Sequence, residues 1–170
     1  MTHGTTKAKP FQALRKPAEG TFRELIRTLG LLERVMQAYF ARFGISGSQW
    51  GVLRNLHRAE GEGLPGLRLT DLSERLLVRP PSVTGAVDRL ERAGLVTRGG
   101  TPTDLRAKQV ALTPKGRDLV EHVLTFHEQQ IDAVLGVLNV TEQAEFQRLL
   151  GRLASHLEQM LGRQAAGTAG

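Results

Sequence analysis

The 170-residue sequence contains no cysteine. Without thiols, disulfides, thiolate metal sites and the sensing of oxidants through cysteine are all excluded. The sequence also has no apolar run as long as a membrane span. Its first residues, Met1 to Pro17, are basic and polar and lack the apolar core of a signal peptide. We therefore expect a cytoplasmic protein with no membrane partner.

The motifs of common enzymes are missing as well. There is no Ser/His/Asp order with an oxyanion signature, no glycine-rich loop for phosphate and no paired-carboxylate motif. Of the five histidines, His122 and His127 are five residues apart, a spacing that does not place them well on one helix face. We expect no catalytic residue, no metal site and no bound cofactor.

Positive charge is present in excess, but it is unevenly distributed. The net charge is +6. Residues 1–67 hold ten Lys/Arg against five Asp/Glu, and residues 68–117 hold the same numbers, whereas residues 118–170 hold three against seven. This distribution places a positive field over the middle of the chain and away from its C-terminal part. A polyanion such as DNA is the partner that such a field favours.

The apolar pattern predicts one globular domain that is mainly helical. Apolar residues recur at helical spacing over Thr21 to Phe43, and again from Pro114 to about Leu138 and after Thr141, which we expect to cap the last helix. We expect a flexible basic arm at residues 1–20, a domain at 21–162 and a disordered tail at 163–170. The long terminal helices have wider apolar faces than the middle of the chain can cover, which predicts a homodimer.

The central stretch, Leu69 to Gly116, predicts two short helices. The first is expected to begin at Thr70 as N-cap and to end near Leu77. The second follows a Pro-Pro pair, and its apolar residues lie on one face at helical spacing: Val83, Ala86, Val87 and Leu90. Its other face is small and polar at the N-terminal end, as a helix that approaches base edges requires.

After the second helix, the pattern changes from helix to hairpin. Gly94 is expected to end the helix in the left-handed conformation. From Val96 onward, and again around Val110, the residues alternate with a period of two. We expect a loop from Gly99 to Lys108 between the strands, and a third short strand at Leu67 to Leu69 beside the hairpin. Thr113-Pro114 starts the next helix, in which Gly116 allows another segment to approach closely.

In this order and spacing, the central motifs resemble the winged helix-turn-helix of the multiple antibiotic resistance regulator (MarR) family. The likeness covers nearly the whole chain. It implies a mainly α fold with a small β-hairpin wing, a winged lobe at about 48–113, and dimerisation helices at about 21–43 and 114–162. The residues that carry it are Ser82-Val83-Thr84, Leu90 to Val96, Asp104-Leu105-Arg106 and Val110 to Gly116.

The resemblance also implies a DNA-binding surface. Ser82, Thr84 and Gly85 are expected in the major groove, with Arg79 and Arg89 on phosphate. Many relatives have a bulkier side chain at the position of Gly85. In the wing, Arg106 is expected to reach the minor groove and Asp104 to hold a cation by an ion pair, while Arg98 and Lys108 attract phosphate.

In the family, a ligand pocket lies between the dimerisation helices and the DNA-binding lobe. Tyr39, Trp50 and His57 fall in that region of the sequence, and they suit a small aromatic or phenolic effector. Ordinary core packing of Tyr39 and Trp50 is an equally good interpretation at this point.

Taken together, the sequence predicts a homodimeric regulator of transcription, most simply a ligand-responsive repressor on a near-palindromic operator in double-stranded DNA. The alternative is a winged-helix scaffold for protein interaction that does not bind DNA with sequence specificity. DNA affinity that falls steeply with salt would separate the two.

Overall fold

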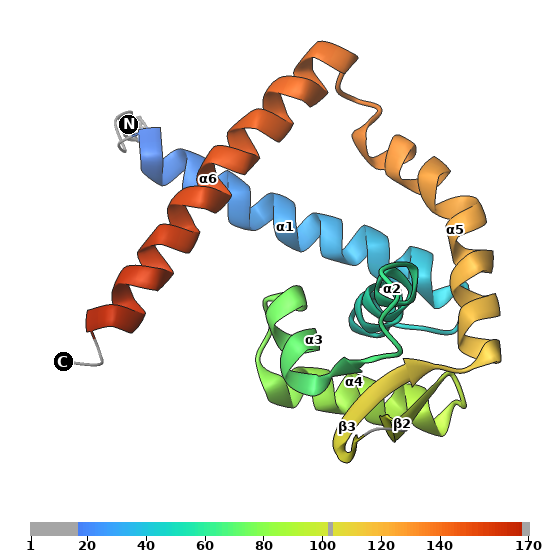
Figure 1. Cartoon of the computed structure of the whole chain (residues 1–170). Coiled ribbons are helices and arrows are strands. Elements are labelled where there is room, and N and C mark those ends of the chain that lie inside the picture. The colour runs from blue at the N-terminus through green and yellow to red at the C-terminus, as the bar shows by residue number, and fades with distance from the viewer. Residues whose placement is uncertain (1–16, 102–103, 168–170) are drawn as a thin grey trace, which may run out of the picture. The chain divides into compact units, whose positions relative to one another are not determined.

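A computed structural model describes residues 17–101 and 104–167; the side chains of residues 100–108 and 164–167 are outside the description. The chain divides into two compact units, the first reaching Val120 and the second starting at Glu121. The elements of the described part are α1 (Pro17–Ala41), α2 (Gly47–Gly61), β1 (Leu67–Arg68), α3 (Leu69–Leu76), α4 (Pro80–Arg92), β2 (Val96–Thr101), β3 (Asp104–Leu112), α5 (Pro114–Leu135) and α6 (Val140–Gly167) (Figure 1). The mainly α fold with a small hairpin is confirmed.

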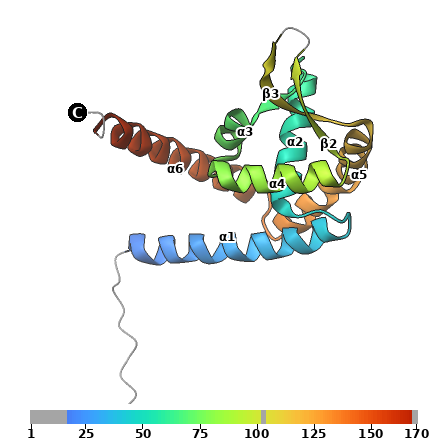
Figure 2. The same cartoon turned by 90° about the horizontal axis from the view of Figure 1, so that it is seen from below.

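The first unit is built around the helices α2, α3 and α4. Their apolar stripes meet in one core, in which Leu53, Leu56, Leu72 and Leu90 are almost completely buried. Burial of a leucine contributes roughly 1.5–3 kcal/mol to folding, so this core supplies much of the lobe's stability. It fixes the orientation of α4, which lies along the outer side of the lobe (Figure 2).

A three-stranded antiparallel sheet completes the lobe, in the order β1-β3-β2. The predicted third strand is confirmed, since Leu67 pairs with Val110 and Arg68 with Gln109. The expected loop from Gly99 to Lys108 is wrong, because β2 continues to Thr101 and β3 already begins at Asp104. Cross-strand hydrogen bonding extends the hairpin through a polar segment whose composition alone suggested a loop.

Two helix starts differ from the prediction. Thr70 lies inside α3, whose N-cap is Arg68; the backbone N–H of Arg68 donates to the Asp71 carboxylate at 3.0 Å. Likewise Thr141 lies inside α6: the backbone N–H of Asn139 donates to Glu142, and that of Glu142 donates to the Asn139 side chain. In both helices, the carboxylate of an acidic residue three positions after the N-cap accepts a hydrogen bond from the N-cap backbone N–H, and this bond determines where the helix begins.

The outer helices also have different ends from those expected. Helix α1 starts at Pro17 rather than Thr21, so residues 17–20 of the predicted arm are helical; residues 1–16 lie outside the described part. Helix α5 stops at Leu135, and α6 continues to Gly167, through most of the tail that we expected to be disordered. Residues 168–170 are not described.

Each unit leaves an apolar stripe exposed. In α1 the stripe consists of Phe22, Ile26, Leu29 and Leu32, and Phe22 is 64% exposed. In α6 it consists of Phe146, Leu149, Leu150, Leu153, Leu157 and Leu161. Contiguous apolar surface of this kind marks a contact with another molecule. None of the described helices combines the length and the hydropathy that crossing a lipid bilayer requires.

One residue in the turn between α3 and α4 has an unusual backbone. Leu77 adopts the left-handed conformation, with φ 53° and ψ 36°, and its side chain is 88% exposed. A residue with a Cβ loses roughly 1–2 kcal/mol in this conformation, and Leu77 gains almost no burial in return.

We expect Leu77→Gly to raise the free energy of unfolding by about 0.5–1 kcal/mol, after subtraction of glycine's extra freedom in the unfolded chain. Leu77→Ala is the matched control, because it keeps the Cβ and should leave the stability nearly unchanged. Urea unfolding followed by circular dichroism measures both, and an equal gain in the two variants would contradict the explanation.

Candidate DNA-binding surface

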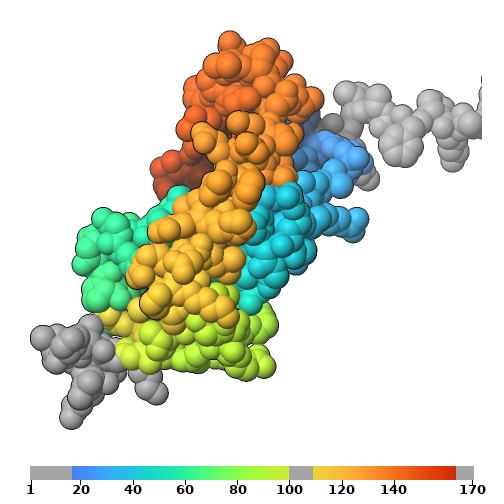
Figure 3. All heavy atoms as spheres, turned by 90° about the vertical axis from the view of Figure 1, so that its right-hand side faces the viewer, coloured from blue at the N-terminus to red at the C-terminus, as the bar shows by residue number. Residues whose placement is uncertain are grey.

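Helix α4 has one buried side and one exposed side. Pro80 and Pro81 begin the helix after the N-cap Arg79, as proline at the first turn favours. The predicted stripe is confirmed, since Val83, Ala86, Val87 and Leu90 are all buried. The opposite side of α4 therefore faces away from the core, and Figure 3 shows its yellow-green surface along the lower edge of the first unit.

The residues predicted to contact DNA lie on or next to this exposed side. Arg79, Ser82 and Arg89 are exposed, while Thr84 and Gly85 are half-buried. The Thr84 hydroxyl donates to the Pro80 carbonyl at 3.1 Å, so a contact with a base requires this hydroxyl to turn or to accept a hydrogen bond. The structure places four of the five residues on α4 and the fifth, Arg79, at its N-cap, and their DNA contacts stay predictions.

Gly85 and Arg89 are neighbours one helical turn apart. A Cβ at Gly85 would lie 3.6 Å from Nη1 of Arg89, which is ordinary contact. The guanidinium of Arg89 therefore extends back along α4 over the space that a larger residue 85 would occupy. It makes no hydrogen bond or ion pair with another residue of the described ranges. A cation thus lies over the small, polar half of α4.

Arg98, at the base of the wing, has partners that the sequence analysis did not foresee. Its guanidinium donates to Glu91 at 2.8 Å and also to Asp88, and both carboxylates belong to α4. Its backbone N–H donates to Glu91 at 3.2 Å. The hydrogen bond to Asp88 and the charge of Glu91 raise the pKa of Arg98 above its ordinary value. Arg98 therefore joins β2 to α4, and its predicted phosphate contact is untested.

A signal for this link was present in the sequence. Asp88 and Glu91 are three apart, hence on one face of the helix, and Arg98 follows the glycine turn at Gly94 by four residues. Because the chain reverses at Gly94, strand β2 returns along the face of α4 that carries Asp88 and Glu91. The arginine side chain is 28% exposed, against 46% for Asp88 and 38% for Glu91, so the guanidinium is the better shielded partner in both ion pairs.

The other wing residues are placed only by their backbone. Asp104, Arg106 and Lys108 belong to β3, on the hairpin that extends from the lobe beside α4 (Figure 2). Their side chains lie outside the described residues, so the minor-groove contact of Arg106 and the ion pair of Asp104 stay predictions. A basic hairpin next to an exposed helix is the arrangement that contact with adjacent DNA grooves needs.

Of the three residues expected to line an effector pocket, two are buried and one is half-buried. Tyr39 and Trp50 are buried in the core, where the Trp50 ring stacks on Phe40 with centroids 5.4 Å apart. Burial also raises the pKa of Tyr39. His57 is half-buried, and its Nδ1 lies 3.3 Å from the Arg54 guanidinium. The geometry favours core packing for the two aromatic residues, and their role in ligand binding is untested.

A three-helix core, a helix with an exposed polar face and a basic antiparallel hairpin define a winged helix-turn-helix of the DNA-binding class. The model of the MarR family matches residues 43–107. The "HTH-type transcriptional repressor YetL" of Bacillus subtilis is 32% identical over 126 residues, which are 74% of each chain. This chain belongs to the MarR family.

Other relatives agree in fold and in name. The "HTH-type transcriptional regulator PecS" of Dickeya dadantii is 27% identical over 78% of this chain and 79% of its own. Among solved structures, Bordetella bronchiseptica BpsR, described as regulated in DNA binding by 6-hydroxynicotinic acid, has a TM-score of 0.72 and 25% identity over 84% of this chain and 98% of its own. Streptomyces coelicolor AbsC, with a TM-score of 0.74 at 22% identity over 87% of this chain and 99% of its own, shows the same fold.

Proposed function

We infer that this chain is a DNA-binding regulator of transcription, in the simplest form a repressor. The observation that carries the inference is the exposed face of α4, with Arg79, Ser82 and Arg89 beside a basic hairpin. The names of the relatives support it, since YetL is a repressor and PecS a regulator. We assign the chain no catalytic activity, and we place it in the cytoplasm, where a bacterial regulator meets its operator.

We propose that two copies act together. Support comes from the apolar stripes of α1 and α6, which a single chain leaves exposed. A two-fold dimer presents two α4 helices to successive major grooves, about 34 Å apart, and so reads a near-palindromic operator.

We also propose that a small molecule regulates the protein by binding more tightly to a form in which the two helices have the wrong spacing. Only a difference in affinity between the two forms can shift the equilibrium. BpsR supports this proposal, since its DNA binding is described as regulated by 6-hydroxynicotinic acid.

The test is binding of the purified protein to DNA upstream of its own gene, compared with a scrambled duplex, at two salt concentrations. We expect sequence-preferring binding that weakens steeply as the salt concentration rises. The same comparison is then made with DNA fragments selected from the whole genome. If the protein binds all of these duplexes equally weakly, it is not a sequence-specific regulator, and a protein-interaction scaffold is favoured instead.

Within the same assay, Arg106→Ala is expected to weaken DNA binding by roughly 1–3 kcal/mol, because the minor groove attracts a cation. Arg163→Ala removes one positive charge near the end of α6 and serves as the control. If Arg106→Ala binds the operator as tightly as the unchanged protein does, the wing has no part in recognition.

A further inference from the structure

The exposed side of α4 is divided into two strips of residues. One strip is occupied, because its two acidic side chains bind Arg98 of β2. The other strip consists of Ser82, Gly85 and Arg89, which are three and four residues apart and therefore lie on one face. In the part of the chain that the structure describes, neither Ser82 nor Arg89 uses its side chain in a hydrogen bond or an ion pair. This second strip is therefore the one that is available to a partner.

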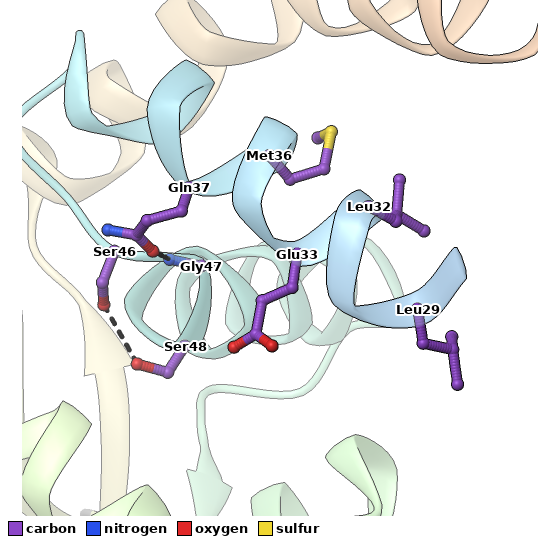
Figure 4. A pocket seen from close by; sticks show the side chains of 8 residues that line it. All are labelled: Leu29, Leu32, Glu33, Met36, Gln37, Ser46, Gly47 and Ser48. Carbon is purple, nitrogen blue, oxygen red and sulfur yellow. Dashed lines mark hydrogen bonds between the residues drawn. The ribbon is translucent and has the colours of Figure 1, made fainter. Parts of the chain in front are cut away.

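The first turn of α4 has no free backbone N–H. Its first two residues are prolines, which have no N–H, and the Ser82 N–H donates to the Arg79 carbonyl at 3.0 Å. The start of α2 is different, because the chain itself caps the N–H groups there: the Gly47 N–H donates to Gln37 at 3.2 Å, beside the hollow between α1 and α2 (Figure 4). Hydrogen bonds from the start of α4 to DNA therefore depend on side chains.

The guanidinium of Arg89 reaches the N-terminal half of α4 from one turn further along the helix. A Cβ at Gly85 would lie 3.6 Å from Nη1 of Arg89. Side chains of a helix point toward its N-terminus, which explains the direction. None of the residues three or four positions away from Arg89 is acidic, and the adjacent Asp88 is bound by Arg98. The guanidinium thus keeps its charge and its donors for a partner.

A free guanidinium distinguishes the bases by their hydrogen-bonding pattern. It has five N–H donors and no acceptor. In the major groove, guanine presents two acceptors, O6 and N7, whereas adenine has an acceptor beside a donor, thymine has one acceptor and a methyl group, and cytosine has a donor. Phosphate also accepts from arginine, but it carries no sequence information. The N-terminal half of such a helix is the part that meets base edges, so a guanidinium held there suits guanine.

We propose that Arg89 binds O6 and N7 of a guanine in each half-site of the operator, and that it does so across the space above Gly85. The small residue at 85 is what allows the guanidinium to lie there. This assignment rests on the proposed function, since it names the base that α4 selects. It replaces the phosphate contact that the sequence suggested for Arg89.

The test selects duplexes from a random pool with the full-length protein and sequences them. The unchanged protein should prefer guanine at one fixed position in each half-site by about 5- to 100-fold. Arg89→Met should lose the preference at this position and keep the preferences at the others. Arg79→Met, which removes a charge at the start of the same helix, is the matched control. It should weaken binding to every duplex by a similar factor and keep the guanine.

Two further comparisons locate the contact. Replacing the selected guanine with 7-deazaguanine removes the N7 acceptor and leaves the base pair and the phosphates intact. It should weaken the unchanged protein about fivefold and leave Arg89→Met unaffected. Gly85→Met fills the space beside the guanidinium and should lower the guanine preference although Arg89 is present. Gly85→Ala adds only a Cβ at ordinary contact distance and should keep this preference.

Three results would overturn the assignment: a guanine preference that Arg89→Met retains, an equal loss of affinity for all duplexes in that variant, or a lost preference for a base other than guanine. The second result would assign Arg89 to phosphate. Each of the three leaves the proposed function standing, because the protein still selects a sequence. If the unchanged protein enriches no sequence from the pool, the proposed function fails together with the assignment.

Discussion

Replacing Gly116 with alanine is expected to lower the free energy of unfolding by about 3 kcal/mol. A Cβ at Gly116 would lie 2.9 Å from the carbonyl carbon of Leu95 and even closer to its oxygen. Both are backbone atoms of the turn after α4, so no side-chain rotation can relieve the clash. Thermal and urea unfolding, followed by circular dichroism, measure the loss.

The surrounding bonds explain why this contact is so close. The N–H of Thr113 donates to Leu95 at 3.1 Å, its hydroxyl donates to the Gly94 carbonyl at 2.7 Å, and Lys115 donates to the Ala93 carbonyl at 3.0 Å. The start of α5 is therefore fixed against the end of α4, and any added atom must break part of this set.

Gly61→Ala is the matched control, because a Cβ at the end of α2 meets nothing within 4 Å. We expect it to leave the stability unchanged or to raise it slightly. The explanation fails if the two alanine variants unfold at the same denaturant concentration.

The second large effect is expected at Arg98. Arg98→Met should weaken operator binding about 10- to 100-fold at low salt, or about 1.4–2.8 kcal/mol. The change removes one positive charge and leaves Asp88 and Glu91 without their cation on α4, the helix that we propose to contact DNA. Titration of fluorescently labelled operator DNA measures the affinity.

Two companion variants sharpen this prediction. Arg148→Met removes an arginine that is also paired with a carboxylate, but on α6, and should leave DNA affinity unchanged. The triple variant Asp88→Asn, Glu91→Gln, Arg98→Met removes all three charges. Recovery of most of the affinity in the triple variant would assign the loss to repulsion of phosphate, whereas no recovery would assign it to the position of the wing. Full affinity in Arg98→Met itself would contradict both.

Much of the fold could be predicted because its signals are local. The buried stripe of α4 follows from helical spacing, and the left-handed Gly94, with φ 70°, follows from its place between a helix and a strand. A close contact at Gly116 could be predicted, because glycine disfavours a helix and its presence just after the Thr-Pro start indicates that another segment approaches there. The identity of that segment, at Leu95, could not be predicted, because a glycine does not indicate which residues approach it.

The candidate site was predictable only in part. The exposure of Ser82 and Arg89 on one helix could be predicted from the spacing of apolar residues. The partners of Arg98 could not, because they depend on how the chain turns between α4 and β2. The two predicted caps at Thr70 and Thr141 were wrong for a related reason. The sequence rule rewards hydroxyl residues such as Thr70, but at this position Asp71 selects the cap through the backbone of Arg68.

The closeness of Gly85 and Arg89 has a consequence for how operator preference can change during evolution. Nη1 of Arg89 lies 3.6 Å from the place of a Cβ at residue 85, so alanine fits there without movement, whereas a longer side chain would compete with the guanidinium for the same space. The effects of long side chains at position 85 and of substitutions at Arg89 on DNA binding should therefore be coupled rather than additive. A change of operator preference by way of a long residue 85 is therefore expected to require a second change at Arg89.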